Sequence, residues 1–404
     1  MNTTTTKKVP ELRFPEFSGE WQTIKLGDFI DSLDAGVSVN SEDRVAKDDE
    51  KAILKTSCVT KGTFDCKENK VVTDSAETRR LKESIEVDTI IISRMNTPQL
   101  VGANALVHES NENIFLPDRL WAAKIKTNAS PRWIALKLGS KSMRAHLSVL
   151  ATGTSNSMKN VTKGDVLNAK ILAPSREEQK KIAGFLGVVD ERVAVIDKKV
   201  ELLKKYRKGV MQKIFPPANG QTPKIRFSDE NGKNYPDWQG KKLGDILAYE
   251  QPTKYIVKST EYDDKYKTPV LTAGKTFILG YTDEEDGINN DIPVIIFDDF
   301  TTASHFVDFP FKVKSSAMKI LRTKTDVNIK VAYELLSKIK FVVGDHKRHW
   351  IGEFQDFAIN LPSEKEQQKI ADFLTNLDDK INVVERQLEQ AKNFKKSLLQ
   401  QMFV

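Results

Sequence analysis

A heptad pattern of apolar positions occurs twice in the chain, in residues 174–215 and again in residues 362–403, which lie 188 positions later. The two copies align without a gap, so PSREEQKKIAGFL in the first becomes PSEKEQQKIADFL in the second. Apolar residues recur at alternating steps of four and three, with polar residues between them. This 3.5-residue period is typical of a helix that packs along a narrow seam against a partner helix. The pattern predicts two long helices, and we expect each to pair with the other copy.

The predicted seam is apolar except for one basic position in each copy, Arg207 and Lys395. A single charged seam position often fixes the register or orientation of a helix pair. We expect that role here, with contact to a phosphate group as the alternative. The apolar positions are Ile182, Leu186, Val189, Val193, Ile196, Val200, Leu203, Val210 and Ile214 in the first copy, and Ile370, Leu374, Leu377, Ile381, Val384, Leu388, Ala391, Leu398 and Met402 in the second.

Both copies begin with a helix-capping sequence. Ser175 stands three positions before Glu178, and Ser363 three positions before Glu366, which predicts a capping box at the start of each helix. A helix over the seam of the first copy would be about 50 Å long at ~1.5 Å per residue, close to the length of about 15 base pairs of duplex. Parallel pairing would place the two flanking domains at the same end, and antiparallel pairing would separate them. The sequence alone leaves this choice open.

A second repeat precedes each helix by more than a hundred residues. LRFPEFSGEWQTIKLGDFI, at residues 12–30, returns as IRFSDENGKNYPDWQGKKLGDIL at residues 225–247. We call these the leading segments. The chain is therefore a tandem duplication of leading segment, insert and long helix. Pro216 and Pro217 end the first helix, because proline cannot donate the backbone hydrogen bond that a continuing helix needs.

The inserts between these repeats resemble each other far less than their flanks do. Short β-branched runs at residues 89–92, 120–125, 293–297 and 318–321 predict buried strands. Helical patterns at residues 134–148 and 327–340 interrupt them, so the inserts should be mixed α/β domains. The predicted organisation is a flexible N-terminal tail (1–10), a first α/β domain (11–165), a first repeat helix (166–216), a linker with a second α/β domain (217–353), and a second repeat helix (354–404).

Composition adds limits rather than a function. The chain has 404 residues and a formal net charge of +7, which permits a polyanionic partner without requiring one. Cys58 and Cys66 are the only cysteines, and no nearby cysteine or histidine completes a metal-ligand set. We expect idle thiols in a reducing cytoplasm. The sequence contains no apolar run of the ~20 residues needed to span a bilayer, and the first residues lack the apolar segment of a signal peptide.

The ordered set of motifs resembles the specificity subunit of type I restriction–modification systems. The resemblance rests on the doubled PSxxEQxxI helix start, the doubled leading segment with its Trp and LGD, and the two divergent inserts. Within the inserts, SRMNTPQLVG (93–102), TGTSNSMKN (152–160) and FDDFTTASHFVDFPFKVKSSAMKIL (297–321) also resemble that family. The resemblance covers nearly the whole chain.

The resemblance implies two target recognition domains held apart by a pair of antiparallel helices, with each domain reading one half of a bipartite site in double-stranded DNA. It implies a chain with no catalysis and no cofactor of its own, acting in the cytoplasm. The implied partners are two methyltransferase subunits, which use S-adenosylmethionine to methylate adenine N6. Two restriction subunits, with ATP and Mg²⁺, complete the implied complex.

Candidate DNA contacts come from polar loops of the inserts. Arg and Lys suit guanine, Asn and Gln suit adenine, and hydroxyl or further basic groups suit phosphates. The alternative for each residue is a solvated loop or a pair that stabilises the fold; Arg94, for example, could be buried against a carboxylate. The candidates are Arg94, Asn96, Thr97, Thr154, Ser155, Asn156 and Lys159 in the first insert, and Thr301, Thr302, Ser304, His346, Lys347, Arg348, His349 and Trp350 in the second.

Two other classes of function remain as alternatives. One is a coiled-coil DNA-binding scaffold or regulator that works without a methyltransferase. The other is a stand-alone nuclease, because Pro236-Asp237 with Asp263-Asp264-Lys265 nominally fits a PD…DxK pattern whose carboxylates would hold Mg²⁺. That pattern arises readily by chance, and Asp237 lies in the repeated leading segment. We therefore favour a non-catalytic chain.

Overall fold

The computed structural model describes residues 8–155, 158–215, 223–272, 276–324, 326–339, 341 and 349–404. The chain divides into two compact units, Met1–Ile196 with Gln387–Val404, and Asp197–Arg386. Both long helices, α5 (Arg176–Ile214) and α9 (Glu364–Met402), contribute one part to each unit. Within the described residues, no helix is both long enough and apolar enough to cross a membrane.

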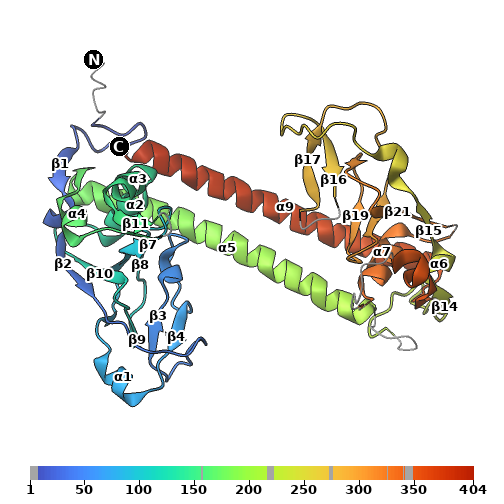
Figure 1. Ribbon diagram of the computed structural model, residues 1–404, viewed down its shortest axis with the longest axis horizontal. Helices are drawn as coiled ribbons and strands as arrows, with labels where there is room; N and C mark the ends of the chain where they lie inside the picture. Colours follow the sequence, from blue (N-terminus) through green and yellow to red (C-terminus); the bar gives the residue numbers. More distant parts are fainter. Residues whose placement is uncertain are drawn as a thin grey trace. The chain divides into compact units, whose positions relative to one another are not determined.

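The first unit holds the N-terminal part of α5, the C-terminal part of α9, and the first insert (Figure 1). Its other elements are β1 (Gln22–Lys25), η1 (Leu26–Asp28), β2 (Ile30–Ala35), β3 (Ala52–Leu54), η2 (Thr56–Val59), β4 (Asn69–Val71), α1 (Ser75–Arg80), β5 (Ser84–Ile85), β6 (Ile90–Ser93), β7 (Met95–Asn96), β8 (Asn104–Leu106), β9 (Asn111–Phe115), β10 (Leu120–Ile125), α2 (Pro131–Gly139), α3 (Lys141–Leu150), β11 (Thr152–Ser155), β12 (Met158–Asn160), α4 (Lys163–Asn168) and β13 (Lys170–Ala173).

The second unit holds the remaining parts of both long helices and the second insert. Its other elements are β14 (Gln239–Lys242), α6 (Leu243–Ile246), β15 (Leu247–Glu250), η3 (Pro252–Tyr255), β16 (Thr268–Leu271), β17 (Ile278–Thr282), β18 (Val294–Asp298), β19 (Ser304–Val307), β20 (Lys312–Val313), β21 (Met318–Thr323), α7 (Ile329–Ser337), α8 (His349–Gly352), η4 (Phe354–Asp356) and β22 (Ala358–Leu361).

A four-stranded sheet lies at the centre of each unit, with the order β2-β10-β6-β8 in the first and β15-β21-β18-β19 in the second. Side chains alternate between two apolar clusters on its two faces. In β6, Ile90 and Ile92 join the cluster that contains the long helices, while Ile91 joins the other. In β18, Ile295 and Phe297 join the cluster that contains the long helices, while Val294 and Ile296 join the other. Because both faces are covered, these strands read as continuous apolar runs in the sequence.

The mixed α/β class predicted for the inserts is confirmed, and each predicted buried run overlaps a strand: β6, β10, β18 or β21. The helix predicted at residues 327–340 corresponds to α7. The single helix predicted at residues 134–148 is wrong, because the chain forms two helices, α2 and α3, that meet at Ser140. Ser140 has extended backbone angles, and its hydroxyl accepts a hydrogen bond from the Met143 N–H, so it starts a new helix.

The two long helices run antiparallel within each unit. In the second unit Lys204 pairs with Glu385, whereas Arg207, further along α5, pairs with Asp378, earlier in α9. In the first unit, residues near the start of α5 pack with residues near the end of α9 in one apolar cluster. Every residue of the predicted seam is buried or half-buried, while the positions beside the seam are mostly exposed. The fold is therefore two mixed α/β domains on an antiparallel helix pair.

Both basic seam residues have carboxylate partners on the other long helix. Lys395 Nζ lies 2.5 Å from Asp190, which also lies 3.0 Å from Arg132 of α2. Arg207 Nε lies 2.5 Å from Asp378, and Lys330 of α7 lies 3.0 Å from the same carboxylate. In each unit, therefore, a basic seam residue of one long helix pairs with an aspartate of the other. That aspartate also pairs with a basic residue of α2 in the first unit or α7 in the second, and we call these two helices the insert helices.

A buried glutamate near the start of each long helix fastens the leading segment. Glu178 accepts hydrogen bonds from the Arg13 guanidinium at 2.7 and 2.8 Å and from the Trp21 indole N–H at 3.2 Å. Glu366 accepts the equivalent bonds from Arg226 at 2.7 and 3.2 Å, and from Trp238 at 3.0 Å. These glutamates are almost fully buried. We call each arrangement the Arg–Glu–Trp clamp.

The clamps correct the predicted capping boxes. The Glu178 N–H does donate to the Ser175 hydroxyl at 3.3 Å, which is half of the expected box. The Glu178 carboxylate, however, turns to the leading segment. In the second copy, the buried Ser363 hydroxyl makes no hydrogen bond within the described part of the chain. The partners of each glutamate carboxylate lie more than a hundred residues away in the sequence, which local spacing cannot show.

The glutamine after each of these glutamates fastens the insert helix. Gln179 Oε1 accepts from the N–H of Ser130, the N-cap of α2, at 3.0 Å. Gln367 Oε1 accepts from the N–H of Asn328, the N-cap of α7, at 2.8 Å. Helix α7 therefore occupies in the second unit the place that α2 occupies in the first.

The repeated Leu-Gly-Asp follows a strand of the leading segment that pairs with the strand before the long helix: β1 with β13, and β14 with β22. A Cβ atom at Gly27 would lie 2.9 Å from the Leu167 carbonyl oxygen, and one at Gly244 would lie 3.0 Å from the Gln355 carbonyl oxygen. Glycine is needed at both positions because a side chain would collide with the backbone of the neighbouring segment. The repeated sequence thus encodes a repeated contact.

The end of α9 is inserted into the core of the first unit. The Phe403 ring stacks on Trp133 and meets Trp21 edge-on. Lys137 of α2 is 4% exposed, and its ammonium group donates to the Val404 carbonyl oxygen at 2.5 Å. Burial lowers the pKa of Lys137 from 10.5 to about 8. A charged ammonium in this place is therefore destabilising relative to water.

We expect Glu178→Ala to lower the free energy of unfolding by about 3 kcal/mol, because it leaves the Arg13 guanidinium without its buried partner. Urea unfolding followed by circular dichroism measures this. Glu177→Ala removes an exposed glutamate from the same helical turn and should change the value by less than about 0.5 kcal/mol. Equal effects of the two substitutions would contradict the clamp.

Stability should rise with pH between pH 8 and 10.5 through Lys137, because the unfolded chain binds more protons than the folded chain in that window. This contribution is fully present above pH 10.5 and is lost as the pH falls to 8. The difference in unfolding free energy between wild type and Lys137→Met should shift by about 3 kcal/mol across the window. A difference that stays constant with pH would show that Lys137 is already charged without cost.

Candidate nucleic-acid interface

Arg94 directly follows the central strand β6 in the first unit. Its guanidinium carbon lies 5.6 Å from the centre of the Trp121 ring, within range of a cation–π contact. The Arg94 Nε is buried and makes no hydrogen bond within the described residues. No carboxylate among them pairs with Arg94, so the structure gives no support to the alternative in which this residue is a buried ion pair. The Trp121 ring thus orients the side chain, and no described acceptor takes a hydrogen bond from its guanidinium.

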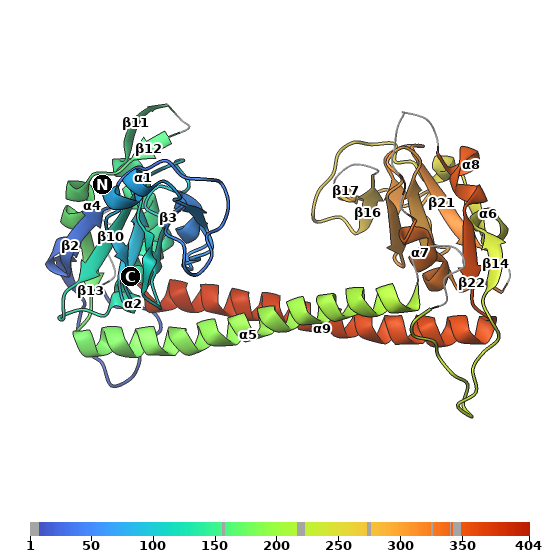
Figure 2. The same ribbon diagram turned by 90° about the horizontal axis from the view of Figure 1, so that it is seen from below.

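Two groups of candidates that are far apart in the first insert lie side by side. Strands β11, β12 and β7 form a three-stranded sheet in which Lys159 pairs with Asn96. Figure 2 shows β11 and β12 on the side of the first unit away from α5. Thr154 and Ser155 belong to β11, and Asn156 lies outside the described residues. The structure therefore places Asn96, Lys159 and the backbone of Thr154 and Ser155 in one sheet.

Helix α3 holds the loop that carries Thr97. The Arg144 guanidinium donates to the Gln99 carbonyl oxygen at 2.6 Å, and the Ser148 hydroxyl donates to that of Pro98 at 2.9 Å. The Asn96 side chain donates to the Ser93 hydroxyl at 3.3 Å and accepts from the Thr97 N–H at 2.9 Å. Asn96 is thus partly used within its own loop.

In the second unit, the candidate hydroxyls lie in the tight turn between β18 and β19. Asp298 accepts hydrogen bonds from the Phe300 N–H at 2.9 Å and from the Thr301 hydroxyl. Thr302 has a positive φ of 61°, which is strained for a β-branched residue, and Ser304 begins β19 half-buried. Thr301 is exposed but already bonded to Asp298, so the turn is rigid.

Asp299 joins this turn to the second group of candidates. Its backbone carbonyl accepts from the His349 N–H at 3.0 Å, and its carboxylate accepts from the Trp350 N–H at 2.9 Å. His349 is 0% exposed and Trp350 is 1% exposed. Neither side chain can reach a base in this structure, so the expectation that they contact DNA is wrong here. Their hydrophobic and hydrogen-bonding partners make them part of the core, and His346, Lys347 and Arg348 lie outside the described residues.

Sequence reasoning missed the acidic residues of this second site. Asp298 and Asp299 are nearly fully buried, and Lys319 Nζ lies 3.6 Å from Asp299 with its side chain fully buried. The sequence did contain a signal for these residues, because two adjacent aspartates follow directly after an apolar run that predicts a buried strand. In the first unit, Arg94 stands at the same end of the equivalent strand. The two units therefore place opposite charges after matching strands.

This arrangement places hydrogen-bond donors together at the described positions. Arg, Asn and Lys side chains grouped on one sheet offer donors to bases and phosphates. Among the residues that the structure describes, no three His, Cys, Asp or Glu side chains are grouped so that they could hold a metal ion. Asp237 of the nominal nuclease pattern is exposed and pairs with Arg226 of the clamp.

Comparison with known proteins points to one family. A family model described as the type I restriction modification DNA specificity domain matches residues 18–205 and 235–393. The specificity subunit of the Escherichia coli type I restriction enzyme EcoR124I/EcoR124II is 47% identical over 164 residues, which are 38% of this chain and 40% of that protein. A Methanocaldococcus jannaschii protein assigned as the MjaX type I specificity subunit is 23% identical over 95% of this chain and 93% of its own length.

A solved structure shares the fold. The S subunit of a type I restriction–modification system from M. genitalium aligns with a TM-score of 0.65 over 98% of this chain and 99% of its own, at 16% sequence identity. At that identity the likeness concerns the fold alone. It agrees with the arrangement of two α/β inserts and a helix pair described above.

Proposed function

Because the chain belongs to the family of type I restriction–modification DNA specificity domains, we propose that each of its inserts reads one half of a bipartite site in double-stranded DNA. The observation that carries this proposal is the contrast between framework and inserts. Both units repeat the clamp, the central sheet and the placement of the insert helix. At the end of the matching central strand, however, the first unit has Arg94 after β6, and the second has Asp298 and Asp299 at the end of β18. The same frame thus presents different side chains.

We propose as the interface of the first unit the sheet of β11, β12 and β7 and the loop after β6, which carry Arg94, Asn96, Thr97, Thr154, Ser155 and Lys159. Asn156, which lies outside the described residues, is also part of the proposal. In the second unit we propose the turn with Thr301, Thr302 and Ser304, together with His346, Lys347 and Arg348, which lie outside the described residues. Arg94 is the strongest of these, since its guanidinium is oriented by Trp121 and has no carboxylate partner among the described residues. An arginine fork binds both acceptors of guanine in the major groove.

The proposed complex contains two methyltransferase subunits that methylate adenine N6 with S-adenosylmethionine, and two restriction subunits that use ATP and Mg²⁺. In this proposal the chain has no catalytic residue and no bound cofactor, and works in the cytoplasm. In this proposal the seam residues pair α5 with α9, and each of these helices contributes one part to each unit.

A methylation map of the genome, made with and without the gene, tests the proposal. A bipartite adenine-methylated motif should be present with the gene and disappear on deletion. Replacing residues 31–165 with another insert should change one half of the motif and leave the other half intact. If deletion left every methylated motif in place in a strain with an active methyltransferase partner, the chain would not supply specificity.

Arg94→Ala should weaken discrimination at one base pair of one half-site by about 1–3 kcal/mol, because a single bidentate base contact is lost. The measurement is the methylated fraction of sites that differ at each position of the motif. Arg192→Ala removes the same charge from an exposed position of α5 and should leave the recognised sequence unchanged. Loss of methylation at all sites without a change of preferred base would place Arg94 on a phosphate instead.

A further inference from the structure

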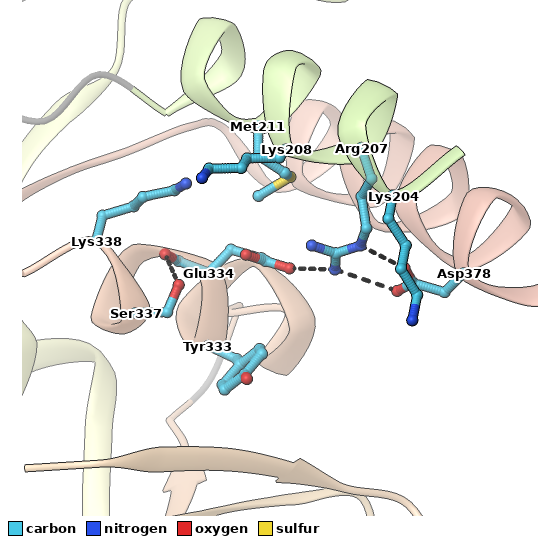
Figure 3. Close-up of a pocket in the computed structure, with 9 residues that line it drawn as sticks. All are labelled: Lys204, Arg207, Lys208, Met211, Tyr333, Glu334, Ser337, Lys338 and Asp378. Carbon is cyan, nitrogen blue, oxygen red and sulfur yellow. Dashed lines mark hydrogen bonds and ion pairs between the residues drawn. The ribbon is translucent and has the colours of Figure 1, made fainter. Parts of the chain in front are cut away.

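A hollow of about 470 Å³ lies in the second unit between the insert helix and the two long helices (Figure 3). Helix α5 forms one wall, α7 another, and α9 contributes a single carboxylate. The lining residues are Lys204, Arg207, Lys208, Met211, Tyr333, Glu334, Ser337, Lys338 and Asp378. The hollow is separate from the proposed DNA-reading turn after β18.

The lining carries more cations than anions. Arg207 is neutralised by Glu334 at 2.7 Å and Asp378 at 2.5 Å, and Lys204 pairs with Glu385 at 2.5 Å. Lys208 and Lys338 form no ion pair with any described carboxylate. Figure 3 shows their ammonium groups pointing toward one another. Two like charges that face each other repel, and an anion between them would remove that repulsion.

The first unit shows that the fold itself does not require this polar lining. Because α2 and α7 start on equivalent glutamine bonds, Glu334 corresponds to Leu136 and Lys338 to Ser140. On the long helix, Met211 corresponds to Leu399. Leu136 and Leu399 are half-buried and pack against the apolar core of the first unit. The same place is therefore filled by apolar side chains in one unit and is hollow and charged in the other.

Stability does not account for the charges either. Glu334 is only 4% exposed, and a buried ion pair is often replaced by apolar side chains without loss of stability. Burial also raises the pKa of Tyr333, with a further contribution from the nearby Glu334 carboxylate. Figure 3 shows Met211 of α5 beside Lys208, and Tyr333 of α7 on the other side of Glu334. The two lysines lack carboxylate partners among the described residues.

We propose that this hollow binds a small phosphorylated molecule of about the size of a mononucleotide, with its phosphate group between Lys208 and Lys338. Its volume falls within the range of about 300–1,000 Å³ typical of small-molecule pockets and exceeds what a phosphate ion alone would fill. Tyr333 and Met211 contact the remainder of the ligand. Glu334 and Asp378 position Arg207 behind the phosphate. The ligand would join the insert helix α7 to the framework helix α5.

Binding of AMP, inorganic phosphate and a short DNA duplex of unrelated sequence to the full chain tests this, by calorimetry and thermal unfolding at constant ionic strength. AMP should bind more tightly than inorganic phosphate and raise the unfolding temperature in a concentration-dependent way. Lys208→Gln and Lys338→Gln should each weaken AMP binding about tenfold or more, because each removes a charge-assisted hydrogen bond. Lys338→Arg should retain binding.

Lys396→Gln is the matched control, since Lys396 holds in the first unit the position that Lys208 holds in the second. It should leave AMP binding unchanged. Absence of AMP binding, or equal binding by wild type and Lys338→Gln, would overturn the proposal. So would binding of the duplex alone through these lysines, because the phosphate would then belong to DNA. None of these readouts depends on the recognised sequence, so the proposed DNA specificity is tested separately.

Discussion

The buried carboxylates of Glu178 and Glu366 connect each long helix to a leading segment that lies more than a hundred residues earlier in the sequence. Each accepts hydrogen bonds from an arginine and a tryptophan of the leading segment, while its own helix carries the seam. A carboxylate in this position is stable only because its charge is met by the guanidinium and the indole N–H. Without the clamp, the strand pairs β1–β13 and β14–β22 would lack this hydrogen-bonded link between the leading segment and the long helix. The glutamine that follows extends the same anchoring to the insert helix.

The charged residues of the seam explain the antiparallel orientation. A parallel, in-register pair would place Arg207 beside Lys395, because the two occupy the same position of the repeat. Antiparallel packing instead gives Arg207 the carboxylate of Asp378, and Lys395 that of Asp190. Burial alone would raise the pKa of Asp378, but hydrogen bonds from Arg207 and Lys330 outweigh it and hold the pKa below its usual value. The seam therefore selects orientation by charge as well as by apolar contact.

Two of the differences between the inserts bear on ligands: the residues that follow the central strand, and the surface where the insert helix meets the long helices. The first unit has Arg94 on the Trp121 ring and an apolar contact at Leu136; the second has the bonded aspartates at 298 and 299 and a charged hollow. Both differences lie outside the alternating core of the central sheets. The fold can therefore tolerate them, and they are where the two units can acquire separate ligands.

The sequence by itself determined the duplication, the two long helices, the seam and the mixed α/β class, because these depend on periodicity and on repeats that are visible along the chain. It also marked Arg94, Asn96 and Lys159 as candidates without showing that they meet. Only the tertiary structure decided that Glu178 serves Arg13 rather than a capping box, that His349 and Trp350 lie in the core, and that Lys208 faces Lys338. These outcomes depend on contacts between residues far apart in the chain, where burial and the pairing of charge, rather than local spacing, determine the partner of a polar side chain.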